Sequence, residues 1–221
     1  MSKQDSFDFL EVYDFLGTHQ DVNTVFWNRV IDDFKWRYNP ESSKTSGLKY
    51  FNKTRARVCS TLSYDFAEDY APNSYIYDRL SYCIKEYTKK YDYLDKLNQH
   101  SQWRLCPSYN VQRYEEGEGY FGLHNESSGA RPYRLLAWMI YLNNAKSGTE
   151  FPYQNRTVTP QKGRTVIWPA GWTHPHKGVT PNEGVKYIAT GWYYTLPKGE
   201  PQFDGKHPDE ERIQEIVICQ L

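Results

Sequence analysis

The sequence predicts a mainly β protein of the α+β class, in which flanking helices pack outside a β core. One observation is that apolar residues recur at helical spacing in the first hundred residues. Another is that short β-branched and aromatic runs, separated by Gly, Pro and Asn, follow from about Trp103 onward. Because 221 residues suffice for one sizeable core, we expect a single domain over residues 1–221.

Two helices are predicted in residues 1–100, which we expect to support the β core. The first ends before Pro40, and its apolar residues recur every three or four positions. These residues are Val22, Val25, Phe26, Val30 and Phe34. The second begins at Asn73 or Ser74 and carries a similar apolar stripe. Its members are Ile76, Leu80, Cys83, Ile84, Tyr87 and Tyr91. Both stripes predict helices that pack against the core on one face.

Five strands are predicted in residues 101–198. They cover residues 111–114, 135–142, 156–159, 164–168 and 186–196. Short strands at this spacing are typical of an all-β sandwich or barrel. Residues 199–221 form a C-terminal tail that we expect to dock as a helix or a strand.

Composition argues against several classes of protein. Lys and Arg total 27 and Asp and Glu total 27, so a strongly basic nucleic-acid-coating protein is excluded. Aromatic residues make up 17% of the chain, too many for a disordered acidic protein. No apolar stretch approaches the ~20 residues of a membrane span, and the N-terminus lacks a signal-peptide core. We therefore expect a cytoplasmic protein with no membrane partner. Its four widely spaced cysteines are expected to be reduced thiols.

His124, Asn125 and Glu126 form a His-x-Glu motif. In an extended segment, side chains two apart point to the same face, so an imidazole and a carboxylate would converge. A second imidazole, from His174 or His176, would complete a set of two histidines and one carboxylate. That set leaves three coordination positions open on Fe(II), as an oxygenase requires. The motif alone is a weak signal, because a surface histidine near a glutamate is common.

A wider set of residues surrounds this motif in a recognisable order. They are Tyr114, Gly117, Tyr120, His124, Tyr141-Leu142-Asn143, Gly148-Thr149-Glu150-Phe151-Pro152, His176 and Lys186. In this order, residues 109–196 resemble the Fe(II)/2-oxoglutarate-dependent oxygenases of the prolyl 4-hydroxylase family. The Tyr-x-x-Gly-x-Gly-Tyr form is also similar to the oxygen-sensing branch and to phage-encoded members. The resemblance implies a double-stranded β-helix (jelly-roll) core with supporting N-terminal helices.

The resemblance implies that His124, Glu126 and His176 bind Fe(II). The family's usual carboxylate is Asp, so Glu126 is a departure that lengthens this ligand by one methylene. His174 is the alternative distal ligand, but the ten-residue spacing to Lys186 favours His176.

Further roles are implied for the co-substrate and the substrate. The residues expected to hold 2-oxoglutarate are Lys186, Tyr114, Thr190 and Tyr141, with Lys186 pairing with the C5 carboxylate. This pairing is physically reasonable, because a lysine inside a barrel is costly unless an anion meets it. Arg134 and Trp192 correspond to positions near the prime-substrate face. O₂ would be the other co-substrate, and the resemblance allows ascorbate as an additional reductant.

The implied activity is that of a dioxygenase that hydroxylates a C–H bond and releases succinate and CO₂. A prolyl residue in a peptide or protein is the leading substrate. One alternative is the same chemistry on a nucleobase or a small molecule, although the zero net charge argues against nucleic acid. Another alternative is a non-catalytic jelly roll that binds Pro-rich peptides. The oligomeric state does not follow from the sequence.

Overall fold

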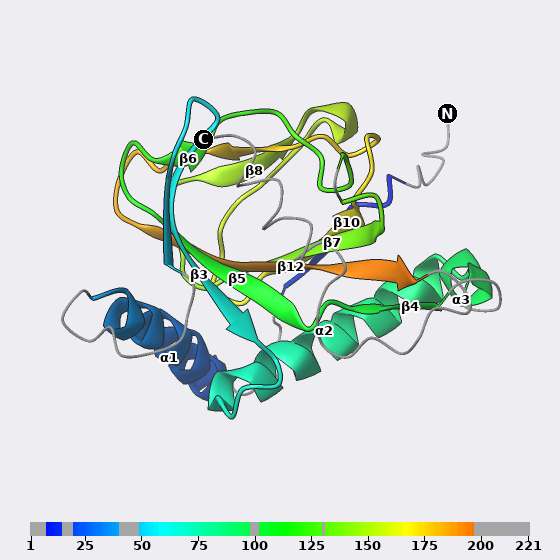
Figure 1. Cartoon of the computed structure of the whole chain (residues 1–221), viewed down its shortest axis with the longest axis horizontal. Helices are drawn as coiled ribbons and strands as arrows, with labels where there is room; N and C mark the ends of the chain where they lie inside the picture. Colours follow the sequence, from blue (N-terminus) through cyan, green and yellow to red (C-terminus); the bar gives the residue numbers. More distant parts are fainter. Residues whose placement is uncertain (1–7, 15–19, 40–48, 98–101, 130, 197–221) are drawn as a thin grey trace, which may run out of the picture.

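The structure is a computed structural model that describes residues 8–14, 20–39, 49–97, 102–129 and 131–196. Two antiparallel sheets face each other, and helices cover the outer face of the larger one (Figure 1). The predicted C-terminal tail lies outside the described residues. The predicted jelly-roll core with flanking helices is confirmed.

The helices are α1 (Gln20–Tyr38), α2 (Ala71–Lys90) and α3 (Tyr93–Leu97), and a short 3-10 helix covers Pro152–Gln154. The strands of the larger sheet are β1 (Glu11–Tyr13), β2 (Lys49–Lys53), β3 (Arg57–Asp65), β4 (Gln102–Leu105), β5 (Ser108–Tyr114), β6 (Gly119–Tyr120), β7 (Arg134–Tyr141), β10 (Thr165–Pro169) and β12 (Lys186–Leu196). The strands of the smaller sheet are β8 (Gly148–Phe151), β9 (Arg156–Val158) and β11 (Lys177–Val179).

The larger sheet runs in the order β1-β10-β7-β12-β5-β3-β2, with β4 also paired to β12 and β6 to β3. The smaller sheet runs in the order β11-β8-β9. Neighbouring strands in these orders are often distant in sequence, and β12 lies between β7 and β5. This crossing of connections brings residues 109–114, 134–141 and 186–196 side by side.

Strand β7 shows how one sheet serves two cores. Leu136, Trp138 and Ile140 pack toward the helices. Ala137, Met139 and Tyr141 pack into the space between the two sheets, where Phe151 and Val158 of the smaller sheet meet them. Successive side chains of a strand point to opposite faces. A strand that is buried on both faces therefore has an almost uninterrupted apolar sequence, which is why this strand could be predicted.

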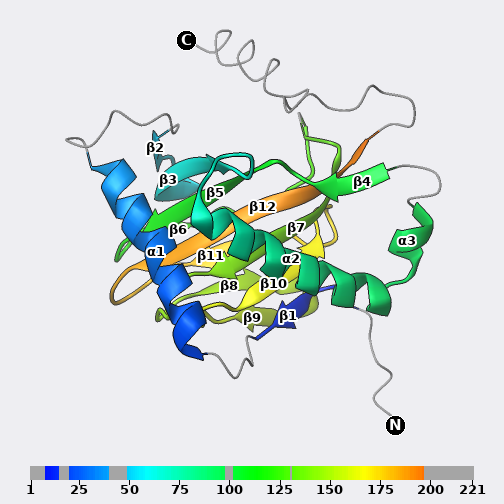
Figure 2. The same cartoon turned by 90° about the horizontal axis from the view of Figure 1, so that it is seen from below.

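Both predicted helices are confirmed, with corrections at their ends and faces. Helix α1 ends at Tyr38, before Pro40 as expected. Helix α2 begins earlier than predicted, at Ala71, because Pro72 in its first turn suits a helix N-terminus. The predicted burial of Val25 is wrong, since its side chain is 48% exposed. The buried face of α1 instead carries Trp27, Val30, Ile31 and Phe34. Figure 2 shows α1 and α2 crossing the same face of the sheet.

All five predicted strands are present, but the description of residues 1–100 as helical support was incomplete. Strands β1, β2 and β3 come from this segment, and β3 lies inside the larger sheet between β5 and β2. Strands β4, β6, β8 and β11 were also missed, and each has four residues or fewer. Strands this short are too brief to show an alternating pattern.

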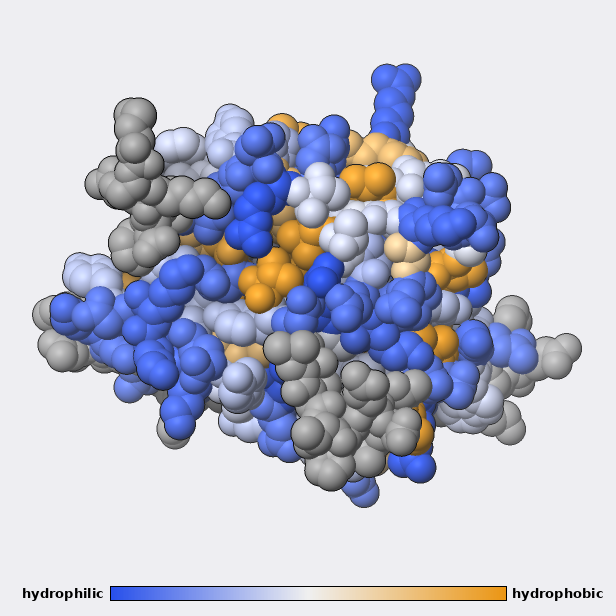
Figure 3. Space-filling model, turned by 180° about the vertical axis from the view of Figure 1, so that it is seen from behind, coloured by the Kyte–Doolittle hydropathy of each residue, from blue (hydrophilic) through white to orange (hydrophobic). Residues whose placement is uncertain are grey.

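The surface is mostly hydrophilic, in agreement with the mean hydropathy of -0.84. On the face shown in Figure 3, hydrophobic residues form small groups between hydrophilic ones. None of the described helices combines the length and the apolar character needed to cross a membrane. Cys59, Cys83 and Cys106 are buried, and none of the three forms a disulfide within the described residues.

Candidate metal centre

The centre begins with a backbone pairing of two histidines. His124 and His176 form an isolated antiparallel bridge, in which each amide N–H donates to the other residue's carbonyl oxygen at 3.0 and 2.8 Å. The pairing joins the loop after β6 to the residue that immediately precedes β11. Two imidazoles separated by more than fifty residues are thereby placed against each other, with ring centroids 4.4 Å apart.

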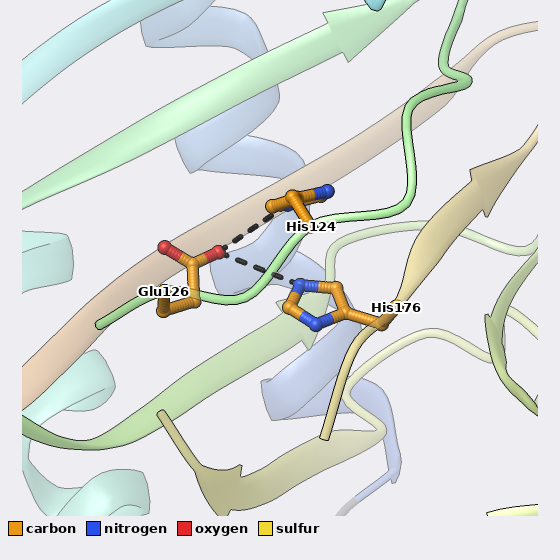
Figure 4. A group of neighbouring side chains, drawn as sticks. All are labelled: His124, Glu126 and His176. Atoms are coloured by element: carbon orange, nitrogen blue, oxygen red, sulfur yellow. Dashed lines mark ion pairs between the residues drawn. The ribbon is translucent and has the colours of Figure 1, made fainter. Parts of the chain in front are cut away.

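Glu126 completes the cluster from the same loop. Its backbone N–H donates to the carbonyl oxygen of Ala170 at 2.9 Å, which anchors the loop to the end of β10. Its Oε1 lies 3.6 Å from Nε2 of His124 and 3.5 Å from Nε2 of His176. Figure 4 shows the three side chains pointing toward one another. One ligand atom from each residue lies within 4.8 Å of the others, so the three can share a single ion.

Hydrogen bonds fix the tautomer of each imidazole. Nδ1 of His124 lies 2.9 Å from the carbonyl oxygen of Gly122, and Nδ1 of His176 lies 3.1 Å from that of His174. Because a carbonyl can only accept, each Nδ1 carries the proton and each Nε2 keeps a free lone pair. This is the arrangement that metal-binding histidines use, with the second nitrogen donating to a backbone carbonyl.

Aromatic rings hold the two imidazoles in place. Tyr120 stacks on His124 with centroids 3.6 Å apart and an interplanar angle of 10°. Phe151 and Trp168 pack against His176 with centroids at 5.3 and 5.0 Å. Tyr120 and Phe151 belong to the motif that the sequence offered, but their packing on the histidines was not foreseen. No sequence signal indicated Trp168.

The second carboxylate oxygen of Glu126 faces away from the histidines. Its Oε2 accepts hydrogen bonds from Arg134 Nη1 at 3.1 Å and from Trp192 Nε1 at 2.9 Å. Burial by itself would raise the pKa of Glu126. The neighbouring imidazoles of His124 and His176 and the positive charge of Arg134 outweigh burial and hold this pKa well below its usual range. The carboxylate is therefore ionised and ready to bind a cation.

His174 lies outside this cluster. Its Nε2 lies 2.7 Å from the carbonyl oxygen of Asp8, and its Nδ1 lies 2.9 Å from Oγ1 of Thr173. Both ring nitrogens are thus engaged elsewhere, while Nε2 of His176 faces Glu126. The structure thus brings His176, and not His174, next to Glu126, and its role as the ligand remains a prediction.

Lys186 is a buried cation at the start of β12. Its side chain is 2% exposed, and its Nζ donates to the carbonyl oxygens of Gly148 and Val179 at 3.4 and 3.3 Å. Within the described part of the chain, no carboxylate pairs with it. Burial lowers its pKa from the ordinary 10.5 to about 8. A buried ammonium with only two long carbonyl contacts is suited to receive an anionic ligand.

The other residues expected to hold the co-substrate lie on the inner face of the same sheet. Tyr114 is opposite Lys186 in the β5–β12 register, and the ammonium lies 4.7 Å from the centre of its ring. Its hydroxyl donates to Oε1 of Gln112 at 2.6 Å. Burial raises the pKa of Tyr114 well above its usual value, so the hydroxyl stays protonated.

Tyr141 and Thr190 already make hydrogen bonds within the protein. The Tyr141 hydroxyl donates to the Val158 carbonyl oxygen at 3.0 Å and lies 2.9 Å from Oγ1 of Thr149. The Thr190 hydroxyl donates to the carbonyl oxygen of Trp138 at 2.9 Å. Either hydroxyl can still accept a hydrogen bond, and their predicted contacts with the co-substrate remain predictions.

The residues present fit a divalent first-row metal. Two imidazole nitrogens with free lone pairs and one ionised carboxylate form the two-histidine, one-carboxylate set typical of non-haem Fe(II) oxygenases. Because the described residues supply three ligands, an octahedral ion held there would keep three positions open for co-substrates. The predicted ligand residues are thus brought together, with Glu126 in the place of the usual Asp.

Comparisons with known proteins support the assignment of this cluster as the Fe(II) site of an oxygenase. A family model described as the 2OG-Fe(II) oxygenase superfamily matches residues 109–194, which include all three residues of the cluster. No curated protein matches the chain.

Solved structures with the same fold include several prolyl hydroxylases. A viral collagen prolyl hydroxylase from Paramecium Bursaria Chlorella virus-1, in its 2OG complex, is 17% identical with a TM-score of 0.57, and the match covers 85% of this chain and 97% of that one. A Pseudomonas putida prolyl-4-hydroxylase is 14% identical with a TM-score of 0.60, over 86% and 94% of the two chains. A Trichoplax adhaerens prolyl hydroxylase, in complex with a hypoxia inducible factor peptide fragment, is 17% identical with a TM-score of 0.58, over 85% and 84%. At these identities the likeness establishes the fold.

Proposed function

Because the chain is a 2OG-Fe(II) oxygenase with the fold of the prolyl 4-hydroxylases, we propose that it hydroxylates a prolyl residue in a peptide or protein. The enzyme is a dioxygenase that uses Fe(II), 2-oxoglutarate and O₂. The prolyl substrate is supported by the similar structures, three of which are prolyl hydroxylases and one of which holds a peptide. The alternative of a non-catalytic peptide-binding jelly roll is disfavoured by the match to an oxygenase family model and by the complete set of metal-ligating residues.

The observation that carries the proposal is the convergence of His124, Glu126 and His176 in a jelly roll that also buries Lys186, with which no carboxylate of the described residues pairs. The three residues would hold Fe(II), which when bound supplies the activation of O₂ coupled to the decarboxylation of 2-oxoglutarate. Every other requirement of the reaction falls to side chains of this chain.

Lys186 would bind the C5 carboxylate of 2-oxoglutarate. It contacts the paired residues Gly148 and Val179, and Val179 is on β11, which starts immediately after His176. The ammonium therefore lies beside the end of β11 and His176 lies just before its start, so one dicarboxylate could contact both groups. Tyr114, whose ring lies beneath the ammonium, would help to exclude water from this end of the pocket.

Holding the co-substrate in a dry pocket has a chemical purpose. The inter-sheet core around Tyr141, Phe151 and Ile188 is apolar, and these side chains are at most 7% exposed. In such surroundings an ion pair between Lys186 and the carboxylate is stronger than in water. These surroundings would also help to keep water from the bound co-substrate, which prevents side reactions.

The test combines two measurements on the folded protein with Fe(II), 2-oxoglutarate and O₂. Succinate formation is measured with and without a library of prolyl-containing peptides, and the peptides are screened for a gain of one oxygen by mass spectrometry. We expect peptide-dependent succinate and an oxidised peptide whose added oxygen lies on proline. The His176→Ala variant, which lacks one proposed ligand, is the control.

Two results would contradict the proposal in different ways. Succinate without any oxidised prolyl peptide would retain the oxygenase and remove the prolyl substrate. Oxidation of a nucleobase, together with binding to single-stranded DNA, would favour the alternative substrate class.

A further inference from the structure

We propose that Arg134 and Trp192 are positioning residues that hold one carboxylate oxygen of Glu126, so that only the other oxygen faces the metal position. The inference rests on the proposed function only in taking His124, Glu126 and His176 as the metal ligands. It gives Arg134 and Trp192 a role other than the substrate contact expected from the sequence.

The two oxygens of Glu126 have different surroundings. Oε1 lies 3.6 and 3.5 Å from Nε2 of His124 and of His176. Oε2 accepts from Arg134 at 3.1 Å and from Trp192 at 2.9 Å. One donor carries a full charge, and a hydrogen bond between charged groups is stronger than a neutral one. Oε1 therefore faces the metal position, and Oε2 accepts hydrogen bonds from the larger sheet.

The two donors are themselves held rigidly. The guanidinium of Arg134 lies over the indole of Trp192, 3.3 Å from the ring centre. Arg134 Nη1 also donates to the backbone carbonyl oxygen of Glu126 at 3.2 Å. Arg134 begins β7 and Trp192 lies on β12, and these two strands are directly paired. The pair of donors thus ties the ligand loop to the centre of the larger sheet.

A glutamate needs this restraint more than an aspartate does. Its side chain has one more rotatable bond, so its carboxylate can turn and offer both oxygens to one ion. Two-oxygen binding would occupy a coordination position that a chelating co-substrate and O₂ require. Because Oε2 is held by two donors, Glu126 is restricted to binding through Oε1, and three positions stay open.

The test removes one donor and measures metal binding directly. Trp192→Phe keeps an aromatic face for Arg134 but deletes the indole N–H. The probe is Co(II), which is stable in air and has visible absorption bands that respond to coordination number. We expect Co(II) to bind about 10- to 100-fold more weakly, as is typical when an outer partner of a ligand is removed. The visible bands should also change, because Oε2 is then held by Arg134 alone and can turn toward the ion more readily.

Trp103→Phe is the matched control. The indole N–H of Trp103 also donates to an oxygen, the carbonyl of Leu94 at 3.0 Å, and its ring packs edge-on against Tyr193. Its removal costs a comparable hydrogen bond but leaves the carboxylate untouched. We therefore expect its Co(II) affinity and its visible bands to match those of the unmodified protein.

A folded Trp192→Phe protein whose Co(II) affinity stays within about threefold of the unmodified protein would overturn the inference. If that variant does not fold, Arg134→Gln removes the other donor's charge, and an unchanged Co(II) affinity there would overturn it equally. These readouts are independent of substrate. A protein that binds Co(II) as expected but leaves every prolyl peptide unmodified would contradict the proposed function alone.

Discussion

Lys186 shows how one buried charge can define a ligand. Its ammonium is enclosed between the two sheets, and among the described residues only carbonyl oxygens accept from it. Burying a cation without a counter-ion destabilises the folded protein through the cost of desolvation. Under the proposed function, binding of the anionic 2-oxoglutarate would offset part of this desolvation cost.

Replacing Lys186 by methionine should separate stability from binding. At pH 7 we expect Lys186→Met to be about 1–4 kcal/mol more stable than the unmodified protein, because an apolar side chain of similar length replaces a buried charge. The rise in melting temperature that 2-oxoglutarate causes in the unmodified protein should disappear. Thermal unfolding with and without 2-oxoglutarate measures both effects.

The control is the pH dependence of stability and of 2-oxoglutarate binding, compared between the unmodified protein and the Lys186→Met variant. The pKa of Lys186 is about 8 in the folded protein and near 10.4 in the unfolded chain. Between these values the unfolded chain binds more protons, so this group makes the unmodified protein more stable as pH rises through that window. Binding of 2-oxoglutarate should weaken above about pH 8, as the ammonium loses its proton. A Lys186→Met protein with undiminished 2-oxoglutarate affinity would contradict the assignment.

The two neighbouring histidines should respond differently to replacement. His176→Ala removes a group whose Nε2 faces Glu126, so we expect Mn(II) binding and turnover to be abolished. His174→Ala removes hydrogen bonds to Asp8 and Thr173, so we expect lower stability with measurable metal binding and turnover. Mn(II) titration followed by electron paramagnetic resonance distinguishes them, and the reverse order would make His174 the ligand.

At the scale of single elements, β12 joins the two functions of the larger sheet. Lys186, Ile188 and Trp192 point into the space between the sheets, whereas Tyr187, Ala189 and Tyr193 pack toward the helices. This alternation is a consequence of strand geometry. The strands β7 and β12 could be predicted because segments of eight and eleven residues that are rich in aliphatic and aromatic side chains leave a clear pattern.

Gly191 on β12 should tolerate no larger side chain. A Cβ atom there would lie 2.6–3.0 Å from ring atoms of Trp138, which is fully buried and directly opposite on β7. We expect Gly191→Ala to cost about 1–3 kcal/mol of unfolding free energy, because the enclosed indole cannot yield without strain. Gly171→Ala is the control, since a Cβ there meets nothing within 4 Å. Urea denaturation measures both, and equal stabilities would contradict this packing.

At the scale of the whole molecule, residues 8–14 connect parts of the protein that are distant in sequence. Leu10 is 1% exposed and packs in the inter-sheet core with residues more than a hundred positions later. The carboxylate of Asp8 pairs with Arg156 at 2.9 Å, and its carbonyl oxygen lies 2.7 Å from Nε2 of His174. The segment therefore connects β1 at one end of the sheet order with the loop that leads to His176.

Leu10→Ala should reveal how much the packing of the N-terminal segment contributes to the free energy of unfolding. We expect a loss of about 2–5 kcal/mol of unfolding free energy, because the cavity would lie in a close-packed core. Leu123→Ala is the matched control, since that leucine is 54% exposed and should change stability by less than about 0.5 kcal/mol. If chemical denaturation gave equal losses of unfolding free energy for the two variants, Leu10 would not be a close-packed part of the core.

The sequence by itself determined the order of chemical groups along the chain. It identified the His-x-Glu motif, the distal His176 with its ten-residue spacing to Lys186, five of the strands and the two long helices. These features could be predicted because each depends on residues that are close in sequence or spaced in a known order. A local pattern is enough to specify them.

The tertiary structure alone decided which groups meet. It placed Arg134 and Trp192 on Glu126, turned His174 toward Asp8, and left Lys186 without a carboxylate among the described residues. It also inserted β3 from the first hundred residues into the sheet. Each of these outcomes depends on strand pairing between distant segments. Pairing partners and register are set by the summed burial of both faces of the sheet, which no local stretch of sequence contains.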